Sequence, residues 1–256
     1  MNLIVLIIIG SLVSAAASYI GSFMVLKRMS LVGDALSHVA LPGIALALLI
    51  HVSPMIGAFA ALFFAVIGIW YLSETSPQYP EALVGVIFTV SLALGVLITP
   101  EQDLLEALFG NIDRISFGEG VLAILVSVAV IGATKMLSKQ LTLELISSEL
   151  AKSAGVLTKR NNFLYLILVG SVVALGVKFA GTLLTGALVI LPAVSAKNIS
   201  RGIIQYQLFS ILFGVIAAMS GIVIAFLVHI SAGPIVILTS GAVFLATYAM
   251  NIISRK

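Results

Sequence analysis

Long runs of apolar residues dominate the chain, and charged or turn-forming residues interrupt them at short intervals. About 20 apolar residues in a helix span the hydrocarbon core of a bilayer. The runs predict nine helices; the sixth and seventh are so close that eight is the alternative count. The predicted helices cover residues 2–26, 31–50, 54–72, 81–99, 119–137, 161–179, 180–196, 206–229 and 233–253. We therefore expect an all-α polytopic membrane bundle of eight or nine helices, forming one domain over residues 1–256.

The composition supports a membrane bundle and excludes a soluble fold. Of the 256 residues, 61% are hydrophobic and 9% are charged, whereas soluble domains are about 25% charged. Nine spanning helices use about 180 residues, which leaves too few for an attached ATPase domain. The chain contains no Cys, so any metal site depends on oxygen and nitrogen ligands.

Positive charges gather on one side of the predicted membrane. With the N-terminus outside, eleven of the thirteen Lys and Arg residues fall on the cytoplasmic side, and only Arg114 and Lys178 lie elsewhere. This is the bias that the positive-inside rule describes, so the net charge of +3 reflects topology and not a nucleic-acid partner. We expect a multi-pass protein of the plasma (inner) membrane, with the N-terminus outside and the C-terminus cytoplasmic.

The first predicted helix carries four small residues spaced by four. They are Gly10, Ser14, Ser18 and Ser22. A stripe of this kind lets a second helix approach closely in a membrane, and we interpret it as a packing surface without chemistry of its own.

Asp34 is the acidic residue that lies well inside an apolar segment, and His38 follows it by one helical turn. A charged Asp at mid-helix costs about 2.5–3.5 kcal/mol on insertion scales, and apolar packing does not explain that cost. An Asp oxygen and an imidazole nitrogen on one face can bind a divalent cation together. The residues alone leave two alternatives open, a structural hydrogen-bonded pair and a proton relay.

Pro42 lies four residues after His38, so it cannot donate a hydrogen bond to the His38 carbonyl. We expect a kink or break in the helix at Pro42 and Gly43. Broken helices at membrane depth recur at transport sites, where free backbone groups line a cavity.

Five segments of the sequence resemble motifs of a known family. The run Ser30–Gly43, which reads SLVGDALSHVALPG, resembles the signature of the permease subunits of divalent-metal (zinc, manganese and iron) ABC importers. Four further segments resemble that family in the same order, so the resemblance spans nearly the whole chain. They are Leu108–Asn111, Glu149–Ala151 with Gly155, Lys178–Ala193 and Ser231–Val236.

The resemblance implies a fold, partners and site residues. The family fold is a helical bundle related to cobalamin- and siderophore-type permeases, and it works as a dimer of permeases with two ATPase subunits and an extracellular metal-binding protein. We expect a homodimer, with a pair of different permeases as the alternative. The intramembrane metal-site residues of the family fall on Asp34 and His38. Its ATPase-coupling segment falls on Ser148, Glu149, Leu150, Ala151 and Gly155.

Two other histidines, His51 and His229, lie at predicted outer helix ends. Either side chain can guide a metal into the entrance, although an exposed interfacial role is the simpler interpretation. In the cytoplasmic segment, Ser148 can cap a short helix, and Gly155 suits its C-terminal stop.

These observations predict a transport subunit and not an enzyme. We expect the membrane permease of an ATP-driven importer of zinc, manganese or iron, with the metal as substrate and without a permanently bound cofactor. The chain has no Gly-x-x-x-x-Gly-Lys-Ser/Thr phosphate loop, so ATP hydrolysis is expected on a partner chain. The alternatives are a secondary transporter or channel with Asp34 as an ion or proton relay, and an ABC permease for a metal chelate.

Overall fold

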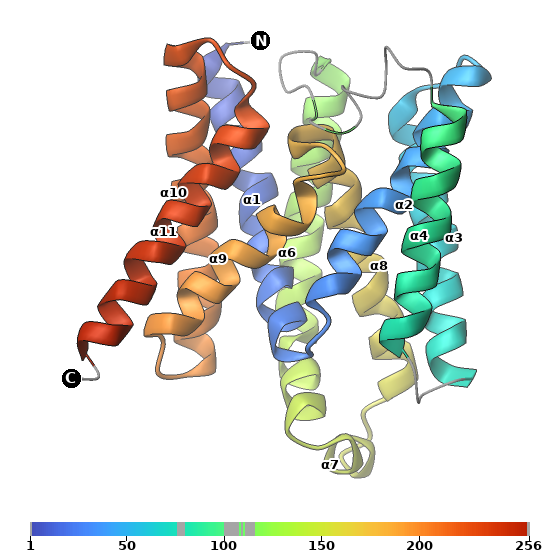
Figure 1. Cartoon of the computed structure of the whole chain (residues 1–256). Helices are drawn as coiled ribbons and strands as arrows, with labels where there is room; N and C mark the ends of the chain where they lie inside the picture. The colour runs from blue at the N-terminus through green and yellow to red at the C-terminus, as the bar shows by residue number, and fades with distance from the viewer. Residues whose placement is uncertain (1, 76–79, 100–107, 109, 111–115, 255–256) are drawn as a thin grey trace.

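The computed structural model describes residues 2–75, 80–99, 108, 110 and 116–254, which form helices joined by turns and short connections (Figure 1). Arg114, Arg255 and Lys256, which entered the charge count above, lie outside the described residues. The helices are α1 (Leu3–Leu26), α2 (Ser30–Leu49), α3 (Pro54–Thr75), α4 (Pro80–Ile98), α6 (Phe117–Ile146), α7 (Ser148–Ser153), α8 (Thr158–Ala180), α9 (Thr185–Ile199), α10 (Ile203–Val228) and α11 (Ala232–Ser254).

Each predicted helical segment corresponds to one helix of the structure, and an all-helical membrane bundle is confirmed. Among the described residues, seven helices are long and apolar enough to cross a membrane. The apolar part of α4 (Val84–Ile98) and α9 are shorter. The 15 residues of α9 rise about 22 Å, less than the hydrocarbon core of about 30 Å. The number of crossings, eight or nine, therefore stays a prediction.

The sixth and seventh predicted segments form two separate helices. α8 ends at Ala180, and α9 begins at Thr185 after a turn. Gly181 opens this turn with a φ of 82°. This conformation is strained for residues with a side chain, so glycine suits the position.

α6 is longer than the sequence predicts, because it runs for 30 residues to Ile146 and not to residue 137. The prediction ended at the basic residues Lys135 and Lys139, but these residues are good helix formers and continue the helix. At the other end, Ser116 and Glu119 form a capping box. The Glu119 N–H donates to the Ser116 hydroxyl at 3.3 Å, and the Ser116 N–H donates to the Glu119 carboxylate at 2.9 Å.

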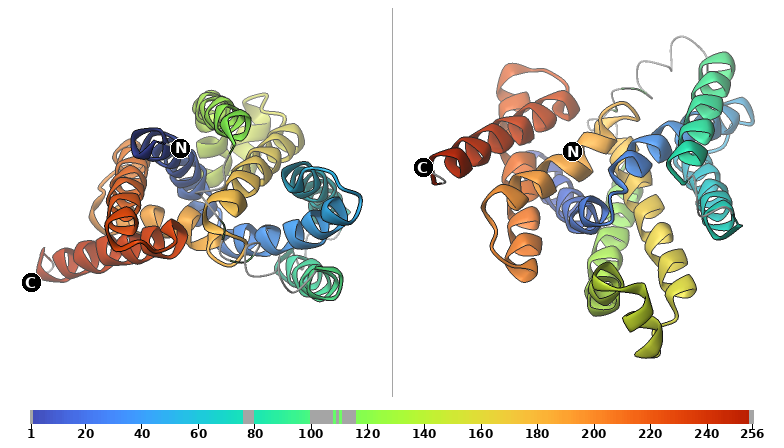
Figure 2. Two further views of the ribbon diagram at one scale, coloured as in Figure 1. Left: turned by 90° about the horizontal axis from the view of Figure 1, so that it is seen from above. Right: turned by 60° about the horizontal axis from the view of Figure 1, so that its bottom comes forward.

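The helices are arranged around a central group, with α10 and α11 on one side and α3 and α4 on the other (Figure 2). α2 and α9 run obliquely through the middle of the molecule, and α7 lies at the end opposite the N-terminus (Figure 1). The hydrophobic core includes fully buried side chains from α1, α2 and α8, such as Phe23, Leu36 and Tyr165.

The small-residue stripe on α1 packs against α10, so its interpretation as a packing surface is confirmed. The Ser14 hydroxyl donates to the Gly214 carbonyl at 2.8 Å. The Tyr206 hydroxyl donates to the Ser22 carbonyl at 3.1 Å. A side chain added at Gly214 would overlap Ser18, which shows how closely the two backbones approach.

Other helix pairs also cross at glycines, where no side chain separates the two backbones. Gly21 of α1 lies against the Val189 backbone of α9, and Gly43 of α2 lies against Gly57 of α3. Close backbone approach of this kind is a main source of helix association in lipid, where water exclusion contributes little.

We predict that Gly21→Ala destabilises the protein by about 1–3 kcal/mol, the usual cost of overpacking. The added methyl carbon would lie 2.9 Å from the Val189 carbonyl carbon, and backbone cannot move aside as a flexible side chain can. The thermal unfolding midpoint of the purified protein in detergent measures this effect. Gly132→Ala on α6 is the matched control, because nothing lies within 4 Å of the added carbon. Equal midpoints for the two variants would contradict the prediction.

Candidate metal site

Asp34 and His38 lie one turn apart on α2, as the sequence predicts. His38 is buried, with 6% of its surface exposed, and Asp34 is partly exposed. Both residues therefore belong to the part of α2 that is enclosed by other helices.

α4 and α9 each supply a contact to this pair. The ring of Phe88 on α4 meets the His38 ring edge-on, with 4.9 Å between ring centroids and 80° between planes. The His38 Nδ1 atom is buried and has no hydrogen-bond partner among the described residues. On the other side, a carbon added at Gly186 of α9 would lie 2.8 Å from the Asp34 Oδ1 atom. Glycine at this position lets α9 lie directly against the carboxylate.

The turn between α8 and α9 connects the pair to the segment before α6. The Ser37 hydroxyl lies 2.7 Å from the Thr182 carbonyl and 2.7 Å from the Asp34 carbonyl. The Leu183 N–H donates to the Leu108 carbonyl at 3.1 Å. Three segments that resemble the permease family, Ser30–Gly43, Leu108–Asn111 and Lys178–Ala193, thus meet at one place. Of the second segment, the structure describes Leu108 and Gly110.

α2 continues through Pro42 and Gly43 to Leu49, so a break of the helix at these residues is wrong, whereas a kink there stays a prediction. Proline removes one backbone hydrogen bond, and the neighbouring turns keep theirs. The two residues mark a crossing point instead. A carbon added at Gly95 of α4 would lie 3.3 Å from the Pro42 ring, and Gly43 lies against Gly57 of α3. They hold α2 between α3 and α4.

His51 and His229 are not gathered with the pair into a larger metal cluster. Across the described ranges, no group of three or more His, Cys, Asp or Glu side chains could hold one metal ion. His51 follows α2 with a φ of 56°, and His229 ends α10 with a φ of 57°. Both are exposed, and His is among the residues enriched in this left-handed conformation. Their positions are therefore explained by a role in ending α2 and α10.

The predicted coupling segment forms the short helix α7, with one correction. The helix is capped by Ser147 and not by Ser148, because the Leu150 N–H donates to the Ser147 hydroxyl at 3.2 Å. Glu149 lies in the first turn, and Gly155 follows the helix with a φ of 78°, as predicted. Ala151 is fully buried, whereas Leu150 is 55% exposed. The helix therefore presents an apolar side chain outward.

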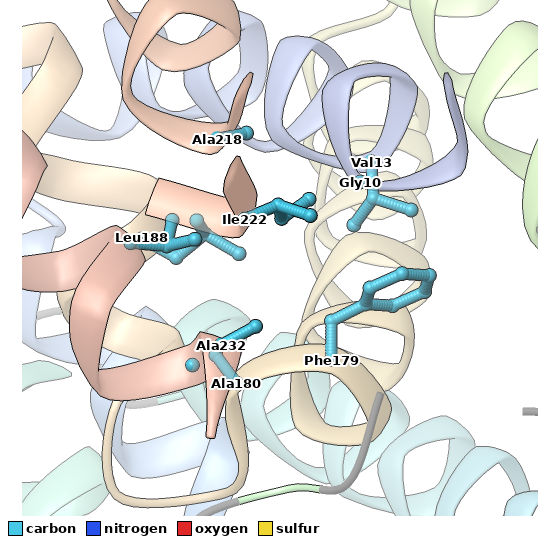
Figure 3. A pocket seen from close by; sticks show the side chains of 10 residues that line it. Gly10, Val13, Phe179, Ala180, Leu188, Ala218, Ile222 and Ala232 are labelled. Atoms are coloured by element: carbon cyan, nitrogen blue, oxygen red, sulfur yellow. The ribbon is translucent and has the colours of Figure 1, made fainter. Parts of the chain in front are cut away.

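A separate cavity lies among α1, α8, α9, α10 and α11 (Figure 3). Its volume is about 20 Å³, close to the space of one water molecule. Apolar side chains such as Val13, Phe179 and Ile222 line it. Such a lining offers no side-chain ligand to a cation, so this cavity is not part of the metal site.

Sequence reasoning did not identify Ser37, Thr182 and Gly186 as neighbours of the pair. All three lie inside the two membrane segments that resemble the permease family. The signal that was available is the set of small and hydroxyl residues there, which permits close approach. Local spacing cannot show which helix approaches which.

The comparisons with known proteins agree with this architecture. The ABC 3 transport family matches residues 2–251. The manganese import system permease protein ScaB of Streptococcus parasanguinis is 32% identical over 248 residues, which cover 95% of this chain and 89% of the relative. The high-affinity zinc uptake system membrane protein ZnuB of Buchnera aphidicola is 28% identical over 251 residues, which cover 95% of this chain and 96% of the relative.

A solved structure, PsaBC from Streptococcus pneumoniae in complex with Fab, matches with a TM-score of 0.83 at 29% identity. The match covers 95% of this chain and 89% of that chain. The match of the family to nearly the whole chain confirms the resemblance drawn from the sequence motifs. The chain belongs to the ABC 3 transport family and is a permease subunit, not an enzyme.

Proposed function

We propose that this permease imports a divalent transition metal and that Asp34 and His38 are direct ligands of the ion in transit. The observation that supports this role is the placement of a carboxylate and a buried imidazole on one turn of α2, enclosed by α4 and α9. Ionisable residues at membrane depth generally mark ion or substrate pathways.

The ligand chemistry favours zinc, manganese or iron as the substrate. Carboxylate oxygen and imidazole nitrogen suit all three ions, and the chain has no thiolate to select a softer metal. The named substrates of the relatives, manganese and zinc, lie within this class. Selection among the three rests on coordination geometry and metal supply more than on affinity.

Two side chains are too few for a selective metal site, since such ions take four or more ligands. Backbone carbonyls, water or a second copy of the chain must supply the others. We propose a homodimer with the pathway between the two copies, so that each copy contributes one Asp34 and one His38.

Energy for transport comes from an ATPase on a separate chain, and we propose that this ATPase contacts α7. The exposed Leu150 and Glu149 form the contact surface, and the buried Ala151 anchors the helix to the bundle. From the distribution of Lys and Arg we propose that α7 and the C-terminus lie in the cytoplasm and the N-terminus lies outside. An extracellular metal-binding protein delivers the ion to the outer end.

Membership of the ABC 3 transport family excludes the alternative of a secondary transporter or channel, which would need no ATPase. One other function is separated from metal-ion import by experiment. In an importer of metal chelates, the free ion does not compete with the chelate. Competition for uptake among free zinc, manganese and iron ions distinguishes the chelate importer and also identifies the metal.

We predict that Asp34→Asn and His38→Ala each reduce metal uptake by about 100-fold or more, since substitutions of outer-shell groups alone cost about 10- to 100-fold. Gly186→Ala should reduce uptake to a smaller extent, because its methyl group displaces the Asp34 carboxylate without removing it. Radiotracer uptake into liposomes that contain the permease and its ATPase measures all three.

Glu119→Gln is the control for this series, since it neutralises a carboxylate at the start of α6, outside the site. The control and the site variants should all assemble with the ATPase. Normal uptake by both Asp34→Asn and His38→Ala would refute the proposed site, and loss of assembly would assign these residues to folding.

We predict that Leu150→Glu abolishes co-purification of the ATPase, because a carboxylate replaces the apolar side chain at the centre of the proposed contact. Phe117→Glu is the matched control at the opposite end of α6, where the side chain is 82% exposed. The measurement is the molar ratio of ATPase to permease after affinity purification. Full retention of the ATPase by Leu150→Glu would show that α7 does not make the contact.

A further inference from the structure

A buried polar cluster joins α1, α6 and α8 at their ends near α7. The Lys27 ammonium lies 3.4 Å from the Glu144 carboxylate, and only 13% and 10% of the two side chains are exposed. The Asn161 amide donates to the other oxygen of the same carboxylate at 3.4 Å, and Asn161 is 2% exposed. We call Lys27, Glu144 and Asn161, with the ring described next, the basal clamp.

An aromatic ring completes the basal clamp. The Lys27 ammonium lies 4.7 Å from the centroid of the Tyr165 ring, and Tyr165 is fully buried. The ammonium is thus held between a carboxylate on α6 and an aromatic face on α8. Both contacts favour the charged ammonium, and both fix its position.

Stability alone does not account for this cluster. Burial lowers the pKa of Lys27, and the Glu144 carboxylate opposes that effect by favouring the charged form. Moving two charges out of water costs free energy that their attraction repays only in part, and apolar residues of similar volume often stabilise a protein as well or better. A buried ion pair is better suited to specifying one geometry among helices than to strengthening the bundle.

The positions of the basal clamp in the chain show which geometry it specifies. Glu144 lies in the last turn of α6, directly before α7, and Asn161 lies in the first turn of α8, directly after it. One carboxylate therefore connects both helices that flank α7. Its ionic partner, Lys27, ends α1 and stands seven residues before Asp34.

The connection from Lys27 to α2 is short, and a backbone hydrogen bond closes it. Arg28 has a φ of 58°, and the Met29 N–H donates to the Met24 carbonyl at 2.9 Å, which closes the end of α1 tightly. α2 begins at the next residue, Ser30. A carbon added at Gly33 would lie 2.9 Å from the end of the Met24 side chain, so the start of α2 packs on the end of α1.

We propose that Lys27 and Glu144 are positioning residues that transmit the displacement of α7 to α2, so that the state of the ATPase sets the position of Asp34 and His38. This inference rests on the proposed function, and in particular on α7 as the ATPase contact. The basal clamp makes α7, the ends of its flanking helices and the start of α2 move as one body.

The test uses the complete complex of permease and ATPase in liposomes, with manganese uptake and ATP hydrolysis measured together. The informative variant is the double substitution Lys27→Met with Glu144→Gln. It removes both charges and keeps the side-chain volumes, so the bundle keeps its packing. The glutamine at position 144 still offers an amide oxygen that accepts a hydrogen bond from Asn161. The conservative variant Lys27→Arg keeps the positive charge opposite Glu144 and the aromatic face of Tyr165, so it tests whether a cation at this position is what is required.

The matched control is Glu119→Gln. Glu119 of α6 forms an ion pair with Lys178 of α8 at 3.2 Å, and glutamine preserves the capping box of Glu119. This variant neutralises a carboxylate on the same helix at the end far from α7. A general effect of removing an ion pair from α6 would appear in both proteins, whereas loss of transmission appears in the double variant alone.

We expect the double variant to assemble and to hydrolyse ATP while the number of manganese ions moved per ATP falls by about tenfold, a size typical of coupling between sites. Lys27→Arg should keep most of that ratio, and Glu119→Gln should keep all of it. An unchanged ratio in the double variant, or equal losses in the double variant and the control, would overturn the proposal.

A second measurement does not require transport. Hydrogen exchange of the α2 segment 30–38 is compared in the complex with and without ATP bound. Exchange in this segment should change with nucleotide in the wild type and the control, and should lose that change in the double variant. A response that is absent in the wild type, or equal in all three, would overturn the proposal. Failure of the wild type to accumulate metal would contradict the proposed function alone, because the exchange measurement needs no metal.

Discussion

Close approach of helix backbones is the constraint on which the rest of this structure depends. Inside a bilayer, helices gain little from leaving lipid for one another, so packing and backbone contact must hold them together. Gly21 against Val189, Gly43 against Gly57 and Gly214 against Ser18 place whole helices in contact. Three such contacts position α2: Gly43 lies against Gly57 of α3, Gly95 of α4 lies against Pro42, and Gly186 of α9 lies against Asp34. The location of Asp34 and His38 is a consequence of those crossings.

The chemistry of the site follows from that placement. A carboxylate in an apolar helix is tolerated where polar neighbours, water or ions accompany it. Gly186 brings the α9 backbone to the Asp34 carboxylate, and Ser37 connects α2 to the turn before α9 through the Thr182 carbonyl. In the same turn, the Leu183 N–H donates to the Leu108 carbonyl. Elements distant in sequence therefore meet around one charged side chain.

Much of this architecture follows from patterns within single segments of the sequence. The rest depends on contacts between segments that are distant in the sequence. Apolar runs predict each long helix, since length and hydrophobicity are properties of a single segment. The pairing of Asp34 with His38 also follows from helical spacing alone. The stop of α6 was predicted too early, because Lys135 and Lys139 indicate the edge of the membrane and not the end of a helix. The cap at Ser147 and the contact of Gly186 with Asp34 depend on geometry between neighbours, which a run of residues does not specify.

The length of α6 has a consequence for the surroundings of α7. Thirty residues rise about 45 Å, which exceeds a hydrocarbon core of about 30 Å by roughly 15 Å. Lipid headgroups occupy only about 6 Å on each side of that core. If the start of α6 lies near the opposite boundary of the core, its far end stands clear of the headgroup layer. A soluble protein that docks on α7, as we propose for the ATPase, can then do so without displacing lipid.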